Sequence, residues 1–315
     1  MSNRGGISIL MPVKNAGKYI NKSIESVLNQ TYRDFELIIL DDSDDETTEI
    51  INSYSDQRIK YIHYSGNISH KLNYGIQKAQ FDYICRMDGD DIIDSKKLER
   101  QINFLKDNPE TDIVGTNYIC INESGDKLYE KKMPEYHIEI AFMMPVITSV
   151  LHSTIMLKKS KLMNLNPYDE NLYYAEDLDL FLKLINSIKF YNLQEPLYYY
   201  RIFKDRSNSH YNKISYLLGL KYLKKKLNTN KNTAETIFQI GLLEYYRNDI
   251  QKARQMFFKL LFSPEIKKLK LFRYLLPTLL GNFIIKSLRH KGFLRKANSL
   301  IIRYFNYDTY YIKLK

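Results

Sequence analysis

Apolar runs and helical periodicities alternate along the first part of the chain. Four segments are continuous in apolar residues, as buried strands are: residues 7–13, 35–40, 58–64 and 83–87. Three segments between them place apolar side chains at helical spacing: residues 16–30, 47–54 and 70–79. Near-continuous apolar strands that alternate with helices are typical of a parallel sheet covered on both faces. The pattern therefore predicts an α/β fold with a mainly parallel central sheet.

The pattern changes near residue 210. Further elements are predicted before it: strands at residues 112–121 and 155–157 and a helix at residues 138–144. After it, the chain is helical in pattern and rich in Lys, Tyr, Leu and Ile. Residues 233–264 fit either a packed helical hairpin or a chance similarity to one unit of a helical repeat. We expect an α/β domain over residues 1–210 and a basic helical region over residues 211–315.

Polar side chains follow three of the predicted strands. They are, in chain order, Asn15, Asp42, Asp88 and Asp90, and Pro12 lies beside Asn15 at the end of the first strand. Because ligands of parallel α/β sheets bind beyond the carboxyl ends of the strands, we expect these residues to line one crevice. No glycine-rich dinucleotide fingerprint follows the first strand, and the sequence contains no P-loop. A bound nucleotide would thus be held by carboxylates and a metal.

The densest polar stretch is Asp88-Gly89-Asp90-Asp91, directly after an apolar strand. Three carboxylates in one place favour a hard divalent cation, Mg²⁺ or Mn²⁺, which takes oxygen ligands from carboxylates, water and substrate phosphates. Gly89 suits a tight bend and a close ligand approach. An acidic turn that caps a helix from Ser95 onward would use the same residue types. Taken alone, the cluster leaves both interpretations open.

Charge is distributed unevenly along the chain. Residues 1–210 carry 25 Lys and Arg against 31 Asp and Glu, whereas residues 211–315 carry 22 against 5. The net charges are thus −6 and +17 within a chain of formal net charge +11. Such asymmetry predicts a basic region that meets a polyanion, either nucleic acid or an anionic membrane surface.

The basic region favours the membrane surface. Residues 267–273 and 288–296 interleave cations with large apolar side chains, as an interfacial helix does. A surface that faces nucleic acid would not expose the apolar residues 275–285, so nucleic acid is the weaker alternative. Packing of this face on the α/β domain or on a second subunit is a third interpretation.

Cysteine content and the chain's apolar segments bear on its compartment. Cys85 and Cys120 both lie in strand-like apolar runs, so we expect no disulfide framework and a reducing environment. The N-terminus lacks an apolar signal segment. Residues 271–285 are interrupted by polar residues and fall short of the ~18–20 residues that a spanning helix needs. We therefore expect a cytoplasmic chain that lies peripherally on the inner face of the cell membrane.

Five short motifs occur in a distinctive order: Met11–Asn15, Ser26–Thr31, Phe35–Ser43, Leu72–Ile76 and Met87–Asp91. In this order the chain resembles the family 2 glycosyltransferases over roughly residues 6–210. The resemblance implies the GT-A fold, a nucleotide-binding α/β sandwich, and a nucleotide-sugar donor.

The resemblance assigns roles at the donor site. Asp42 would contact the uracil or ribose of the donor, and Pro12 and Asn15 would line the same pocket. Asp88 matches the ribose-contacting aspartate of the family, and Asp90 matches the metal ligand that bridges to the diphosphate. A cation held there would stabilise the charge that grows on the departing nucleoside diphosphate.

Three further residues are candidates by the same resemblance. Relatives commonly carry an arginine where this chain has Lys71, which could supply positive charge to the diphosphate or lie on a solvated helix face. Arg201 matches a Tyr-Arg arrangement near the donor diphosphate, and a guanidinium suits phosphate oxygens. His152 lies in a region that approaches the transferred sugar and the acceptor in relatives; a core or surface histidine is the alternative.

Glu176 and Asp177 form the second acidic candidate site. Inverting transfer needs a base for the acceptor hydroxyl proton, and the pair resembles the family's Glu-Asp motif, whose Asp is that base. At ~100° per residue, Asp177 lies roughly 90° from the centre of the apolar stripe of its helix and Glu176 nearly opposite. Glu176 is a candidate contact of the acceptor or sugar. An acidic helix N-terminus that favours the macrodipole is the alternative explanation.

These observations predict an inverting, metal-dependent hexosyltransferase. Its donor would be a UDP-linked hexose or N-acetylhexosamine, and its acceptor a lipid-linked oligosaccharide of capsule, O-antigen or exopolysaccharide assembly. A nucleotidyltransferase on a related fold is one alternative, but it would be expected to carry a glycine-rich or basic phosphate loop after the first strand. A nucleotide-sugar-binding protein without activity is the other, and it would be expected to lack Asp90 or Asp177.

Overall fold

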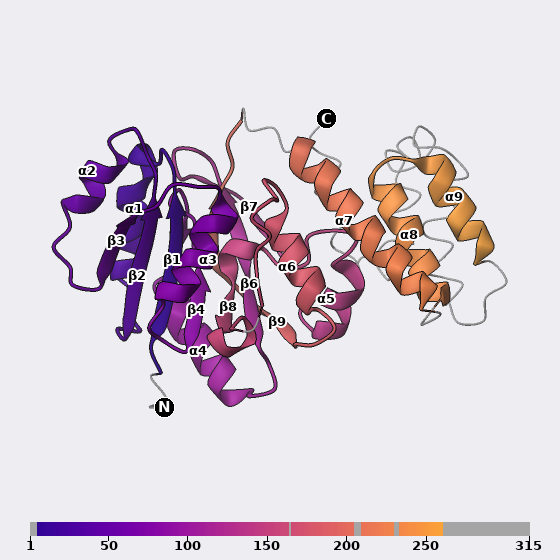
Figure 1. The fold of residues 1–315 in the computed structure, drawn as a ribbon, viewed down its shortest axis with the longest axis horizontal. Helices are drawn as coiled ribbons and strands as arrows, with labels where there is room; N and C mark the ends of the chain where they lie inside the picture. The colour runs from indigo at the N-terminus through magenta and orange to yellow at the C-terminus, as the bar shows by residue number, and fades with distance from the viewer. Residues whose placement is uncertain (1–4, 164, 205–208, 230–232, 261–315) are drawn as a thin grey trace. The chain divides into compact units, whose positions relative to one another are not determined.

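The computed structural model describes residues 5–163, 165–204, 209–229 and 233–260 (Figure 1). Contacts within the chain divide it into two compact units. The first consists of Met1–Met144 and Thr148–Ser215, and the second of Pro145–Ile147 and Tyr216–Lys315. Each unit is described by itself.

The first unit is built on a mixed sheet. Its strands are β1 (Ile7–Val13), β2 (Phe35–Asp41), β3 (Ile59–His63), β4 (Tyr83–Arg86), β5 (Ile92–Ile93), β6 (Ile113–Ile121), β7 (Lys127–Lys131), β8 (Met156–Lys158) and β9 (Phe190–Arg201). Their order across the sheet is β3-β2-β1-β4-β8-β6-β9-β5, with β7 paired to β6. The strands from β3 to β4 are parallel, as predicted, and β6 and β9 are also parallel. Antiparallel pairs join β8 to β4 and β6, and β5 to β9.

The helices also follow the predicted order. They are α1 (Gly17–Leu28), α2 (Thr47–Asn52), α3 (Ile68–Lys78), α4 (Lys97–Asp107), α5 (His137–Met143), α6 (Glu176–Leu184), α7 (Ser209–Asn228), α8 (Thr233–Tyr246) and α9 (Ile250–Lys259), with short 3₁₀ turns η1 (His152–Thr154) and η2 (Lys159–Lys161). The α/β part thus has the predicted alternation of strands and helices.

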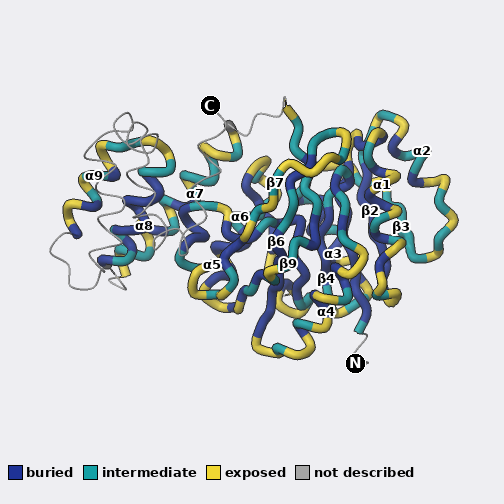
Figure 2. Tube along the Cα trace, turned by 180° about the vertical axis from the view of Figure 1, so that it is seen from behind, coloured by how far each residue is buried: buried dark blue, intermediate teal, exposed yellow. Residues whose placement is uncertain are grey.

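Helices cover both faces of the sheet at β1, because successive residues of a strand point to opposite faces. Ile9 and Met11 belong to the same buried core cluster as Ile20 of α1. On the other face, a Cβ on Gly75 of α3 would lie 3.1 Å from a methyl carbon of Leu10. The tube view shows β1 and its neighbour β2 as buried (Figure 2). The continuous apolar pattern of β1 is explained by burial on both faces.

The strand order reverses at β1. β1 pairs in parallel with β2 on one side and with β4 on the other. The chain leaves β1 for β2 and β3, then returns across β1 to form β4. In open α/β sheets, ligands bind beyond the carboxyl ends of strands where the order reverses in this way. The polar segments after β1, β2 and β4 all lie at this edge.

The second unit is helical over its described residues. α8 and α9 pack as a helical hairpin, which was one of the two interpretations of residues 233–264, and Asn248 takes a left-handed conformation (φ 66°) between them. A Cβ on Gly241 would lie 2.5 Å from the ring of Phe257, so the absence of a side chain at Gly241 allows the two helices to pack closely. The predicted membrane-binding segments, residues 267–273 and 288–296, lie outside the described residues.

Two expectations about the whole chain can be compared with the structure. Cys85 and Cys120 are both buried, and no disulfide joins them. In the part of the chain that the structure describes, no helix combines the length and the apolar character needed to cross a membrane.

Candidate active site

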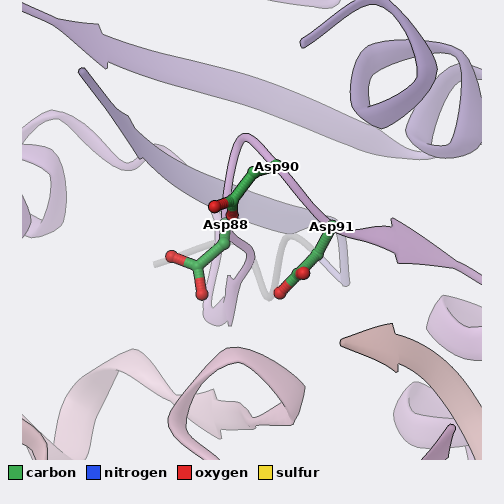
Figure 3. Close-up of side chains that lie close together, drawn as sticks. All are labelled: Asp88, Asp90 and Asp91. Atoms are coloured by element: carbon green, nitrogen blue, oxygen red, sulfur yellow. The ribbon is translucent and has the colours of Figure 1, made fainter. Parts of the chain in front are cut away.

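Three carboxylates project from the turn between β4 and β5 (Figure 3). One oxygen from each of Asp88, Asp90 and Asp91 lies within 4.8 Å of the others. A Cβ on Gly89 would lie 2.9 Å from a methyl carbon of Val13, so the turn packs against the end of β1. Gly89 therefore permits the close approach that the sequence predicted, although the atoms it approaches belong to the protein itself.

Asp91 anchors this turn to β9. Its carboxylate accepts a hydrogen bond of 2.8 Å from the Tyr198 hydroxyl and one of 2.6 Å from the Arg201 backbone N–H. Burial, followed by the charges of Asp88 and Asp90, raises the pKa of the Asp91 carboxyl well above its ordinary value. The sequence left Asp91 between a cap and a direct role; the structure gives it a buried anchoring role.

The side chain of Arg201 in β9 also holds this turn. Its Nε donates to the Asp90 carbonyl at 2.7 Å, and Nη1 donates to the Asn122 and Glu123 carbonyls at 2.9 and 3.0 Å. The guanidinium also lies 4.6 Å from the ring centroid of Tyr19. These contacts fix the backbone around the carboxylates. The contact of Arg201 with a donor diphosphate stays a prediction.

Arg86 is a site residue that the sequence analysis did not single out. It ends β4, is only 5% exposed, and forms an ion pair with Asp88. Burial alone would lower the pKa of its guanidinium, but the charges of Asp88 and Glu176 help to raise it overall. One signal was available in the sequence: an arginine inside an apolar strand must be paired if that strand is buried.

The second acidic stretch begins α6, after Ala175 in a left-handed conformation (φ 59°). Burial raises the pKa of the Asp177 carboxyl, although hydrogen bonds from the Leu178 N–H (2.7 Å) and the Tyr211 hydroxyl oppose this effect. Burial and the neighbouring Asp177 raise the pKa of Glu176 to about 7.

The predicted outward orientation of Glu176 was wrong, because Glu176 is only 9% exposed. It is the first residue of α6, where the orientation of the chain entering the helix matters more than helical periodicity. Arg86 lowers the pKa of both Glu176 and Asp177, whereas Asp88 raises that of Glu176. The two acidic stretches therefore meet around Arg86.

Lys71 links the ends of β1 and β2. Its ammonium donates to the Val13 carbonyl at 2.6 Å and forms an ion pair with Asp42. At 3% exposure Lys71 is buried, so the alternative of a solvated helix position was wrong. Burial raises the pKa of the Asp42 carboxyl, but Lys71 and Lys14 outweigh this and lower it overall.

Asn15 and Pro12 lie at the same edge of the sheet. Asn15 is left-handed (φ 52°), its N–H donates to the Ser43 hydroxyl at 2.7 Å, and its side-chain carbonyl accepts from the Asp44 N–H at 3.0 Å. Pro12 lies opposite Leu40 in the register of β1 and β2. Asn15, Asp42 and Lys71 thus lie where β1 and β2 end, with Pro12 near the end of β1; their contact with a nucleotide stays a prediction.

His152 is buried in η1 at 5% exposure. Its Nε2 lies 2.8 Å from the Tyr168 hydroxyl, and its ring packs edge-to-face on Phe181. Burial and the charge of Arg86 lower the pKa of the imidazole well below its ordinary value, which keeps it neutral. Its contact with an acceptor or sugar stays a prediction; the observed contacts are those of a core histidine.

The carboxylate cluster has the chemistry of a hard-cation site. Mg²⁺ and Mn²⁺ prefer oxygen ligands, and Asp88, Asp90 and Asp91 supply carboxylate oxygens close together. Mutual repulsion contributes to the raised pKa of Asp91, and a bound cation would offset that repulsion. The residues fit such a cation: Asp90 would hold it beside Asp88, while Asp91 already accepts two hydrogen bonds and Asp88 is paired with Arg86.

Known proteins share both the sequence pattern and the fold. The family model described as glycosyl transferase family 2 matches residues 8–165. The chain is 36% identical over 236 residues to the O-antigen biosynthesis glycosyltransferase WbnJ of Escherichia coli, which covers 71% of this chain and 91% of WbnJ. It is 34% identical over 222 residues to the putative glycosyltransferase EpsE of Bacillus subtilis, covering 66% of this chain and 78% of EpsE.

A solved structure has the same fold. The crystal structure of residues 1–349 of S. aureus TarS in complex with UDP-GlcNAc superimposes with a TM-score of 0.61 and 20% sequence identity. The superposition covers 82% of this chain and 77% of the TarS fragment.

Proposed function

The chain belongs to glycosyl transferase family 2, and on that premise we propose that it transfers a hexose or N-acetylhexosamine from a UDP-linked donor to a glycan acceptor. Its GT-A fold places the ends of β1, β2 and β4 at one edge of the sheet. The UDP part of the proposal is supported by the UDP-GlcNAc complex of TarS, which has the same fold.

One observation carries the proposal. The carboxylates after β4 and those at the start of α6 are far apart in sequence, yet Arg86 is ion-paired with Asp88 and interacts electrostatically with Glu176. Transfer between two substrates needs a donor group and an acceptor group in one place, because positioning removes much of the entropic cost of their meeting. Two acidic stretches thus converge on the buried guanidinium of Arg86, and this arrangement supports a site for two substrates.

At the donor side, Asp42 would contact the nucleoside, within the pocket formed with Pro12, Asn15 and Lys71. Asp90 would hold Mg²⁺ or Mn²⁺, and Asp88 beside it would contact the ribose. Such a cation, when bound, supplies positive charge beside the diphosphate of the donor.

At the acceptor side, Asp177 would act as the base of an inverting transfer. Its carboxylate would take the proton of the acceptor hydroxyl while the acceptor oxygen forms the new bond to C1 of the sugar. The bond from C1 to the diphosphate oxygen breaks with its electron pair, and UDP leaves. Burial raises the pKa of Asp177, which makes its carboxylate a stronger base than a solvated aspartate.

The acceptor would be a lipid-linked oligosaccharide of surface-polysaccharide assembly. The relative named for O-antigen biosynthesis supports this choice. We further propose that the protein is located in the cytoplasm, peripherally on the inner face of the cell membrane, and that the excess of basic residues after residue 210 contacts anionic lipids. Nucleic acid is not part of the proposal.

Calorimetric titration with UDP and GDP tests the donor site. Each nucleotide is added to the full chain with Mn²⁺, with Mg²⁺ or with a chelator. We expect metal-dependent preference for UDP, lost in Asp90→Ala and kept in the control Asp107→Ala, an exposed aspartate at the end of α4. Absent or metal-independent binding of UDP would overturn the donor assignment.

A further inference from the structure

The first turn of α7 contacts the start of α6 through a hydroxyl group. The Tyr211 hydroxyl lies 3.3 Å from Oδ1 and 3.2 Å from Oδ2 of Asp177, within hydrogen-bonding reach of both carboxylate oxygens. Both residues belong to the first unit of the chain. Tyr211 lies 46 residues beyond the last residue matched by the family model, residue 165, so this contact comes from a part of the chain that the family model does not cover.

A second contact holds the same two segments together. The ring of His210 stacks on the ring of Tyr174, with centroids 5.5 Å apart and planes inclined by 17°. Tyr174 and Asp177 flank the N-terminus of α6, and His210 and Tyr211 are neighbours in α7. Two consecutive residues of α7 thus contact two positions around the start of α6, so the hydroxyl is presented to the carboxylate from a fixed direction.

We propose that Tyr211 is a positioning residue for Asp177: its hydroxyl donates a hydrogen bond that orients the carboxylate and favours its ionised form. This inference rests on the proposed function, in which Asp177 is the base. The hydroxyl serves as a donor at neutral pH because burial and the charges of Asp177 and Glu176 raise the pKa of Tyr211 well above its ordinary value. A neutral phenol beside a carboxylate can only donate its proton to the hydrogen bond, since an ionised carboxylate has acceptors alone.

Other groups also face Asp177. Arg86 at the end of β4 favours the carboxylate, as does the Leu178 N–H of α6 itself. Glu176 on α6 and Tyr168 both interact electrostatically with Asp177. Burial disfavours the ionised form of Asp177 more strongly than Arg86 and the Leu178 N–H favour it, so the pKa of Asp177 is raised. Removal of the Tyr211 hydroxyl takes away one of the opposing contributions, and the pKa of Asp177 should then rise further.

The test compares Tyr211→Phe with wild type and with Tyr54→Phe. Tyr54 is a matched control because its hydroxyl also hydrogen-bonds within the protein, to the backbone and side-chain oxygens of Asn21 in α1, outside the contacts of Asp177. The first readout is the carboxyl ¹³C titration of aspartate-labelled protein, with the Asp177 signal assigned by its loss in Asp177→Asn. We expect a higher pKa for Asp177 in Tyr211→Phe and an unchanged one in Tyr54→Phe.

The second readout is UDP release from UDP-glucose, UDP-galactose and their N-acetylated forms as a function of pH. For whichever donor wild type turns over, Tyr211→Phe should lower kcat by about tenfold and move the acid limb to higher pH, with the KM for the donor unchanged. A purely structural role would change the stability of the protein but not the acid limb.

The outcomes separate the inference from the function on which it rests. An unchanged Asp177 titration in Tyr211→Phe overturns the positioning role, whatever the activity. Wild-type kcat and an unshifted acid limb in Tyr211→Phe, with Asp177→Asn inactive, overturn it as well and leave the base assignment standing. Wild-type turnover in Asp177→Asn overturns the base assignment and with it the proposal.

Discussion

The guanidinium of Arg86 and the carboxylate of Asp88 form an ion pair at the end of β4, within the first unit of the structure. The Arg86 side chain is 7% exposed and that of Asp88 is 26% exposed. The pair therefore joins a buried guanidinium to a partly exposed carboxylate. Because Arg86 also interacts with Glu176, the same guanidinium connects the turn after β4 with the start of α6.

Loss of the Arg86 charge should destabilise the fold. Arg86→Met leaves Asp88 without its buried partner beside Asp90 and Asp91, and breaking such a pair costs about 3–5 kcal/mol. The free energy of unfolding in urea, measured without divalent cations, gives the comparison. Arg100→Met is the control, since Arg100 pairs with Glu195 at the exposed surface and its loss should cost less than about 1 kcal/mol.

The double variant Arg86→Met with Asp88→Asn sharpens this prediction. If the cost arises from an uncompensated carboxylate, neutralising Asp88 should restore part of the stability. Equal unfolding free energies for the Arg86 and Arg100 variants would show that the ion pair contributes little.

Lys71 should stabilise the fold through Asp42 in a pH-dependent manner. The pKa of Asp42 is lowered in the folded protein, so the contribution of its charge is present above its unfolded pKa and is lost as the pH falls through its folded pKa. Lys71→Met should cost about 1–3 kcal/mol at pH 7. Urea unfolding at decreasing pH should show the gap between this variant and wild type narrowing as Asp42 becomes protonated.

The control for Lys71 is Lys14→Met. Lys14 lies 3.5 Å from the other oxygen of Asp42, but its side chain is 63% exposed, so its loss should cost less than about 1 kcal/mol. A gap between Lys71→Met and wild type that stays constant with pH would mean that the effect arises from lost packing rather than from the charge pair.

The sequence predicted the sheet and the position of the acidic stretches because both depend on local patterns. The strand–helix alternation and the polar residues at strand ends follow from apolar runs that stop abruptly, as at Met87-Asp88. The partners of these residues depend on distant segments. Asp91 bonds to Tyr198, 107 residues away, and Asp177 to Tyr211 on a helix whose direction no local pattern determines. Such contacts arise from tertiary packing, and they decide what each carboxylate does.

Glu176 should make the protein less stable as the pH rises. Its pKa is raised from 4.5 to about 7 by burial and by Asp177, so the folded protein holds the proton more tightly than the unfolded chain does. Stability from this group is complete below pH 4.5 and is lost as the pH rises toward 7. In Glu176→Gln this loss of stability with rising pH should be absent. Urea unfolding of wild type and of the variant at several pH values between about 4.5 and 7.5 would measure the difference.

Glu139→Gln is the matched control for Glu176, since Glu139 is exposed in the first turn of α5. Because the charge of Asp177 also affects the titration of Glu176, the relevant quantity is the difference between the two stability profiles and not a midpoint. Parallel profiles for wild type and Glu176→Gln would contradict the prediction.

Removal of residues 265–315 should release the protein from membranes. This segment contains the two basic and apolar stretches from which membrane binding was predicted, 267–273 and 288–296. Cosedimentation of the full chain with vesicles that contain anionic phosphatidylglycerol should be strong and should fall with salt, whereas pure phosphatidylcholine vesicles should bind weakly. Equal sedimentation of the trimmed and full chains with the anionic vesicles would exclude this surface as the membrane contact.

Asp177→Asn should abolish sugar transfer while leaving UDP binding nearly intact. The amide keeps the size of the side chain but cannot take the acceptor proton, and a positioned base contributes about 10²–10⁴-fold to a rate. Asp179→Asn is the matched control on the same helix, because Asp179 is paired with Lys183 at 2.7 Å and is not assigned a chemical role. Transfer is followed by UDP release, and binding by calorimetry with Mn²⁺. If Asp177→Asn also lost UDP binding, Asp177 would belong to the donor site instead. Removal of a base alone would leave the proposed nucleotide contacts around Asp42 unchanged.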